Sequence, residues 1–247
     1  MEAYDYKNGL KRIKEILNDS NDIMEVDKIP TDNEFTYENG YYGWVDAIFV
    51  DIRDSTSLFA ENKKTSTAKI IRCFTSEIIE ILNDDNLREV GIRGDCVYAI
   101  YAAKKIKDSI NTFEKGLYIN TFLKMLNKIL ESKKMMTIKA GIGIATNQDL
   151  VIKAGKKGSG INNKVWIGKA VTFASKLSNM ANKNNSPILI SELFYNCFIE
   201  EYKKENSNYQ NNWFFKYTDK KIGDYYGCNL VKSDFEKWIN DGMDENE

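Results

Sequence analysis

The hydrophobic positions along this chain alternate between strand-like runs and helical stripes. Val45 to Val50 is an apolar run interrupted only by Asp46, which is typical of a buried strand, and this strand is expected to end at Asp51. Further elements are expected in chain order as helices over 66–82, 115–130, about 168–182 and 191–198, and strands over 137–145, 187–190 and 213–231. Strands that alternate with helices without an internal repeat predict an α/β (α+β) fold with a mixed sheet.

The same pattern divides the chain into three parts. Residues 1–40 contain a short amphipathic helix, with Leu10, Ile13 and Ile16 on one face, followed by a polar lead-in. Residues 41–232 carry the regular strands and helices and are expected to form one domain. Residues 233–247 are acidic, and we expect them to form a frayed tail.

Two acidic residues stand where strands end or turn. Asp51 ends the first strand, and the polar residues 53–56 that follow can cap a helix whose free amides face an anion. Gly94 and Asp95 lie between two short apolar strands and predict a tight hairpin with Asp95 at its tip. Each acid alone would ordinarily be a cap or turn residue, and Asp46 and Asp54 are expected to be solvated or capping.

The pairing of Asp51 with Asp95 changes this interpretation. If the hairpin lies beside the first strand, the carboxylates meet at one edge of the sheet and repel each other unless cations lie between them. Two metal ions flanking a phosphate suit in-line displacement at phosphorus.

Composition limits the chemistry available. The chain of 247 residues has no histidine, so imidazole catalysis and histidine–metal sites are excluded. Its 35 basic and 36 acidic residues nearly balance, which does not favour nucleic-acid binding. The four cysteines form no paired motif, no apolar run reaches membrane-spanning length and no signal peptide is recognised, so a cytoplasmic protein is expected.

The segment from Val151 to Ser191 contains seven lysines and no acid. This predicts a local positive field suited to polyphosphate, although most of these lysines are expected to be solvated. Gly155 to Gly160 does not match a phosphate-binding P-loop, and we expect this segment to be a flexible flap over the site.

Three blocks carry a family resemblance: F-V-D-I-R-D-S-T at 49–56, R-G-D-C-V-Y-A-I at 93–100 and W-I-G-K-A-V-T-F-A-S-K-L at 166–177. In order and spacing the chain resembles the catalytic domain of class III nucleotidyl cyclases over about residues 45–190. It is most similar to the pyrimidine cyclases of the bacterial Pycsar anti-phage system. The resemblance implies a ferredoxin-like βαββαβ palm core and a catalytic domain over 41–232.

The resemblance also implies roles for individual residues. It assigns metal ions, Mn²⁺ or Mg²⁺ and two per site, to Asp51, Ile52 and Asp95, and the phosphates to Arg53, Asp54, Ser55 and Thr56. The family's Asn and Arg on the following helix correspond to Thr172 and Lys176, which lie one helical turn apart. Lysine supplies the charge without the two-pronged geometry of arginine, and we expect Lys176 to stabilise the transition state.

The base-reading positions depart from those of purine cyclases. One corresponds to Gly91, which offers no side chain, and the other to Val165 beside Trp166. Arg93 lies on the same strand face as Gly91 and could donate to the carbonyls of a pyrimidine, although it could instead simply cover the strand. These departures favour UTP or CTP over ATP.

The resemblance further implies a homodimer with shared active sites, and an effector protein that responds to the cyclic nucleotide product. Two alternatives remain open from the sequence: a purine cyclase with unusual base readers, and a non-catalytic protein that binds nucleotide. A diguanylate cyclase is disfavoured because its G-G-[DE]-E-F signature is missing.

Overall fold

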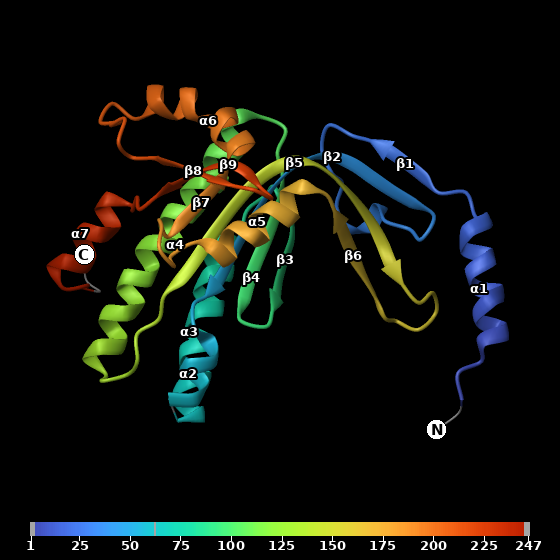
Figure 1. Cartoon of the computed structure of the whole chain (residues 1–247), viewed down its shortest axis with the longest axis horizontal. Coiled ribbons are helices and arrows are strands. Elements are labelled where there is room, and N and C mark those ends of the chain that lie inside the picture. Colours follow the sequence, from blue (N-terminus) through green and yellow to red (C-terminus); the bar gives the residue numbers. More distant parts are fainter. Residues whose placement is uncertain (1–2, 62, 245–247) are drawn as a thin grey trace.

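A mixed sheet with helices on both faces organises the molecule (Figure 1). The computed structural model describes residues 3–61 and 63–244. The strands are β1 (Asp22–Glu25), β2 (Asn39–Ile52), β3 (Leu87–Arg93), β4 (Cys96–Ala102), β5 (Ala140–Gly155), β6 (Asn162–Ile167), β7 (Ile188–Ser191), β8 (Phe215–Asp219) and β9 (Gly223–Cys228). The helices are α1 (Tyr6–Asn18), η1 (Asp32–Glu34), α2 (Ser55–Glu61), α3 (Lys64–Leu82), α4 (Ile106–Ser132), α5 (Lys169–Met180), α6 (Glu192–Glu205) and α7 (Ser233–Asp241).

The centre of the sheet has the predicted ferredoxin-like connectivity. The elements β2, α3, β3, β4, α4 and β5 follow one another along the chain, and their strands lie in the order β3-β4-β2-β5 with antiparallel neighbours. Strand β7 then adds to β5 in parallel and is followed by β9 and β8, which makes the sheet mixed. The predicted α+β class and palm core are therefore confirmed.

From Val45 to Val50 strand β2 is covered on both faces, which explains why only Asp46 interrupts its apolar run. Ile48 and Val50 face the core formed with α3, α4 and α6, whereas Val45 and Ala47 face a second core that includes α5. Side chains alternate along a strand, so Asp51 lies on the face covered by α5.

Asp46 differs from its prediction, because it is fully buried rather than solvated or capping. Neither of its carboxylate oxygens has a hydrogen-bond partner among the described residues. The hydroxyls of Thr112 and Thr146 lie near it but donate to the carbonyls of Asp108 and Val45. Burial raises the pKa of Asp46 from 3.8 to about 6, because it penalises the charged form of the carboxyl.

Asp46→Asn is therefore expected to stabilise the protein at pH 7.5 by roughly 1 to 3 kcal/mol. The stability that the raised pKa confers is fully present below the ordinary pKa and is lost as pH rises through about 6. The gain of the variant should consequently shrink as pH falls from 7.5 to 4.5. Urea unfolding across this range tests the prediction, with exposed Asp27→Asn as the control. An Asp46→Asn protein less stable than the parent at pH 7.5 would contradict it.

A local helix cap corrects one predicted boundary, and tertiary packing corrects another. The helix expected over 115–130 begins at Ile106, because Asp108 caps its first turn by accepting from the amide of Lys105 at 2.8 Å. The expected frayed tail instead forms α7, in which Ile239 is buried and Glu236 pairs with Lys124 of α4. Residues 245–247 of that tail lie outside the described residues.

The predicted amphipathic helix at the N-terminus is present as α1, but this chain does not cover its apolar face. Leu10, Ile13 and Ile16 are exposed, and Figure 1 shows α1 at the edge of the molecule beyond β1. Among the described residues, no helix combines the length and hydropathy that crossing a membrane would require.

Candidate active site

The β2 strand and the β3–β4 hairpin bring Asp51 and Asp95 together. Asp51 is the register partner of Cys96, the residue that directly follows Asp95. Gly94 has a φ of +66°, the left-handed conformation that the tight hairpin turn requires. Burial, and after it the charges of Asp51 and Asp95, raises the pKa of the Cys96 thiol to about 12, so both acids lie around this cysteine.

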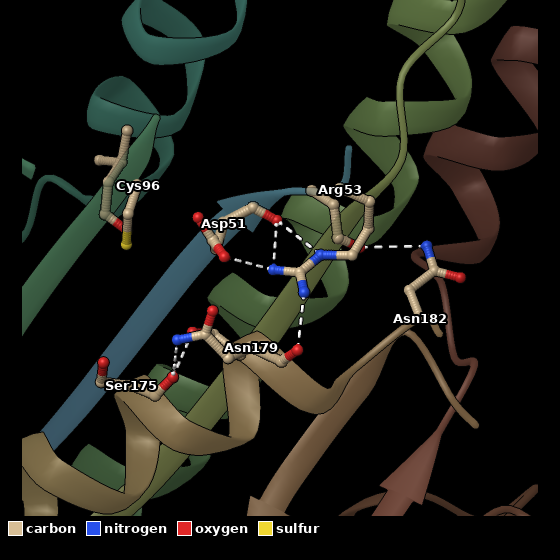
Figure 2. A network of polar contacts seen from close by, with 9 residues as sticks. Asp51, Arg53, Cys96, Ser175, Asn179 and Asn182 are labelled. Atoms are coloured by element: carbon tan, nitrogen blue, oxygen red, sulfur yellow. Dashed lines mark hydrogen bonds and ion pairs between the residues drawn. The ribbon is translucent and has the colours of Figure 1, made fainter. Parts of the chain in front are cut away.

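Asp51 lies in a polar network at the end of α5 (Figure 2). Arg53 forms an ion pair with its carboxylate, donates to its main-chain carbonyl at 3.1 Å and donates to the Asn179 carbonyl at 2.7 Å. Burial raises the pKa of Asp51, the cation of Arg53 opposes this shift, and the charge of Asp95 adds to it.

A divalent cation fits this pair of acids. The charge of Asp95 adds to the raised pKa of Asp51, and a pair of neighbouring carboxylates is the donor set that a hard cation neutralises. Among residues 3–61 and 63–244, no group of three or more acidic, cysteine or histidine side chains could hold a metal ion. Further ligands would therefore come from main-chain carbonyls, water and phosphate oxygens.

The segment after Asp51 turns sharply into α2. Asp54 adopts a left-handed φ of +54°, and α2 begins at Ser55. The amide of Arg53 donates to the Lys139 carbonyl at 2.7 Å, so this amide is engaged in the sheet. A phosphate at this turn would therefore meet the main chain from Asp54 to Thr56.

A second group of predicted residues lines a pocket of about 480 Å³ on the α5 face of the sheet. Its lining contains all the predicted base readers and the helical pair: Arg93, Val165, Trp166, Thr172 and Lys176. The volume lies within the range of small-molecule sites. The structure therefore gathers residues from β3, β6 and α5 that are up to 83 positions apart, from Arg93 to Lys176.

Helix α5 carries the predicted pair, Thr172 and Lys176, and packs closely against the sheet. A side chain at Gly143 would meet the carbonyl of Ala174 at 2.1 Å, so the glycine permits the close approach that its sequence context predicts. Buried Asp149 accepts from the amides of Ala170 and Val171, each at 3.1 Å, and thereby caps the start of α5. Burial raises the pKa of Asp149, although these amide hydrogen bonds favour its charged form.

The predicted pair on α5 is exposed at the pocket. Thr172 and Lys176 are four residues apart in one helix, and the hydroxyl of Thr172 donates to the Gly168 carbonyl at 2.7 Å. The amine of Lys176 lies 5.9 Å from the centre of the Phe173 ring and forms no ion pair among the described residues. It is therefore available to an anion.

Three pocket residues escaped sequence reasoning. Glu89 accepts a hydrogen bond from the Tyr98 hydroxyl at 2.6 Å, and Tyr98 stacks on Phe49 with ring centres 5.1 Å apart. A side chain at Gly91 would meet the Tyr98 ring at 2.5 Å. The tyrosine thus occupies the space above the position from which purine cyclases are expected to read their base. The two-residue periodicity of β3, which places Glu89, Gly91 and Arg93 on one face, was the available signal.

The segment predicted to be a flexible flap, Gly155 to Gly160, lies at the turn of a hairpin formed by β5 and β6. Residues 162–167 form β6, which pairs with β5 in continuous register from Leu150 to Gly155. Lys157 pairs with Glu38 at 2.6 Å, and Lys164 pairs with Asp32 at 2.5 Å, so these two lysines serve the fold. Strand β6 can hold Trp166 at the pocket because it pairs with β5 along its whole length.

The two groups of site residues do not share one pocket in this protomer. Neither Asp51 nor Asp95 is among the described residues that line the pocket with Lys176. The chain thus presents two groups of predicted site residues, an acidic pair and a pocket that contains cationic and aromatic side chains. The fold is that of class III nucleotidyl cyclases, a fold that generally uses divalent metal ions.

Comparison with known proteins supports this class. Residues 38–216 match the adenylate and guanylate cyclase catalytic domain, and the chain belongs to this family as a nucleotide cyclase, a lyase. It is 50% identical over 246 residues to a uridylate cyclase of Treponema porcinum, covering 99% of this chain and 84% of the relative. It is 38% identical over 189 residues to a uridylate cyclase of Gulbenkiania mobilis, covering 73% of each.

Solved structures share the fold at low sequence identity. The guanylyl cyclase Cya2 superposes with a TM-score of 0.63 at 14% identity, covering 78% of this chain and 95% of that one. The adenylyl cyclase CyaB from P. aeruginosa gives a TM-score of 0.62 at 18% identity, covering 76% and 95%.

Proposed function

We propose that the chain is a uridylate cyclase that converts UTP to 3′,5′-cyclic UMP and pyrophosphate. The observation that carries the proposal is the pocket in which Tyr98 fills the space above Gly91 while Arg93 and Trp166 line the walls. A compact pocket with a cationic donor suits a single ring bearing carbonyls. Both relatives described above are uridylate cyclases, which favours UTP over CTP, a choice that the sequence left open.

The residues of this chain have separable roles in the proposed reaction. Divalent cations, Mn²⁺ or Mg²⁺ and two per site, would be held by Asp51, the Ile52 main chain and Asp95, and would lower the pKa of the ribose 3′-hydroxyl. The deprotonated 3′-oxygen attacks the α-phosphorus in line, the bond to the bridging oxygen breaks and pyrophosphate leaves. The main chain at Ser55 and Thr56 holds the departing phosphates. Lys176 stabilises the charge that develops at the α-phosphate, and Thr172 lies beside the ribose.

The proposed active enzyme is a head-to-tail homodimer. The acidic pair of one chain would face the pocket of its partner, which explains why Asp51 does not line the pocket that holds Lys176. Two equal sites would form, and a single protomer would be inactive.

The product assay tests the proposed substrate. We expect incubation with each of the four nucleoside triphosphates and Mn²⁺ to yield cyclic UMP as the main product, identified by chromatography and mass. A main product of cyclic CMP would reassign the base. Cyclic AMP or GMP would establish the purine alternative, and binding of UTP without pyrophosphate release would establish a non-catalytic nucleotide-binding protein.

We further propose a cytoplasmic enzyme whose product acts on a separate cyclic-nucleotide-responsive effector in anti-phage defence. The four cysteines are free in the structure, in keeping with a reducing compartment. Cells that carry the gene with its neighbours should accumulate cyclic UMP on phage infection. Unchanged levels in infected cells would argue against the defence role.

A further inference from the structure

Glu89 forms a bridge across the base pocket. Its carboxylate accepts from the Tyr98 hydroxyl of β4 at 2.6 Å and from the Trp166 indole N–H of β6 at 2.7 Å. Strand β6 pairs with β5, whereas β3 and β4 lie on the opposite side of β2, so these contacts join two separate parts of the sheet. Glu89 therefore fixes the two aromatic residues relative to each other.

The Glu89 carboxylate can accept a further hydrogen bond in addition to these two. Burial, and then the hydrogen bond and charge of Glu89, raises the pKa of Tyr98, so the phenol remains the donor. Lys164 lines the same pocket, but its amine donates to Asp32 and to the Arg88 carbonyl. Among the described residues no lysine or arginine forms an ion pair with Glu89. Two accepted bonds leave free lone pairs on a carboxylate.

Glu89 and Arg93 thus offer the pocket an acceptor and a donor from one strand. They lie four residues apart on the same face of β3, and both line the pocket. Uracil presents a ring N–H flanked by two carbonyls, which needs an acceptor beside a donor. Cytosine has an unprotonated ring nitrogen at this position, and its lone pair would face the carboxylate.

Resting on the proposed function, we propose that Glu89 is the residue that selects uracil. Its carboxylate accepts the N3–H of the base, and its bridge between Tyr98 and Trp166 excludes the second ring of a purine. Two variants separate these contributions. Glu89→Gln keeps the side-chain volume and removes the charge, whereas Glu89→Ala removes the bridge as well.

The experiment measures affinity and turnover of UTP, CTP and ATP for the full-length parent and both variants. Binding is followed by calorimetry with Ca²⁺, and turnover by product chromatography with Mn²⁺. Glu77→Gln, on the exposed face of α3, is the matched control. Melting temperature and circular dichroism verify that each variant folds.

For Glu89→Gln, UTP affinity and kcat/KM should fall about 10- to 100-fold, the range for losing a hydrogen bond to a charged group, while CTP changes less than about threefold. For Glu89→Ala, the preference for UTP over ATP should fall by a further factor of about ten, as the pocket widens. Equal losses for all three nucleotides in folded variants would overturn the proposal, since they indicate a purely structural role. Unchanged values would also overturn it.

The binding measurements distinguish failure of this inference from failure of the proposed function. If the parent binds UTP selectively but releases no pyrophosphate, the cyclase proposal fails while altered selectivity of Glu89→Gln still supports the role of Glu89. If the parent prefers another base, the UTP assignment fails and selection of uracil by Glu89 fails with it.

Discussion

Replacement of Asp51 by asparagine is expected to lower pyrophosphate release from UTP by about three orders of magnitude or more. Asparagine removes the negative charge that Asp51 and Asp95 together would offer to cations, and Asp95 alone cannot hold a cation pair. Binding of the base should survive, because the pocket that contains Arg93 and Trp166 lacks Asp51. The expected pattern is therefore a large loss of kcat with a small change in nucleotide affinity.

The thermal stability of the Asp51→Asn variant shows whether a loss of activity reflects the chemistry or the fold. Burial raises the pKa of Asp51, so its ionised form is disfavoured by its surroundings, and a neutral asparagine relieves that cost. Loss of the ion pair with Arg53 acts in the opposite direction. The melting temperature should consequently change little. Exposed Asp85→Asn, which makes the same charge change, should keep parental activity. An Asp51→Asn enzyme with more than a tenth of parental kcat would show that the acid pair is not the metal site.

Periodicity and short motifs predicted most of the core because both are local properties. The run from Val45 to Val50 identified the central strand, and Gly94-Asp95 identified the hairpin that the register places beside Asp51. The family resemblance identified Thr172 and Lys176, helical spacing places them on one face of α5, and they do line the pocket with the predicted base readers.

The sequence did not predict the burial of Asp46, the formation of helix α7 or the position of Glu89 at the pocket. Each of these depends on an element that is distant in the sequence and packs against the residues concerned. Asp46 is a fully buried carboxyl with a raised pKa because α4 covers it, and nothing in its neighbouring residues indicates that cover. The acidic segment after residue 232 forms α7 because it docks on α4 through Glu236 and Lys124. Glu89 acquires its place in the pocket only when β6 brings in Trp166, 77 positions later.

Mixing two inactive variants is expected to restore activity. Lys176→Ala should lower kcat by roughly two to three orders of magnitude, because the cation near the α-phosphate is lost. In the proposed head-to-tail dimer, a heterodimer of Asp51→Ala and Lys176→Ala combines intact acids from one chain with an intact lysine from the other. One of its two sites is complete, so tandem-affinity-purified heterodimers should show about half of parental activity.

A second pair of variants is the control that shows whether the recovery comes from active sites shared between subunits. A heterodimer of Asp51→Ala with Asp95→Ala has one defective acid pair in each site and should remain inactive, even though it assembles in the same way. If each chain instead supplied both its acids and its lysine to one site, every site of either mixture would contain a defect. Neither mixture would then recover. Recovery in the first mixture alone therefore requires that Asp51 of one subunit and Lys176 of the other act on the same nucleotide, and its absence in intact heterodimers would exclude the shared site.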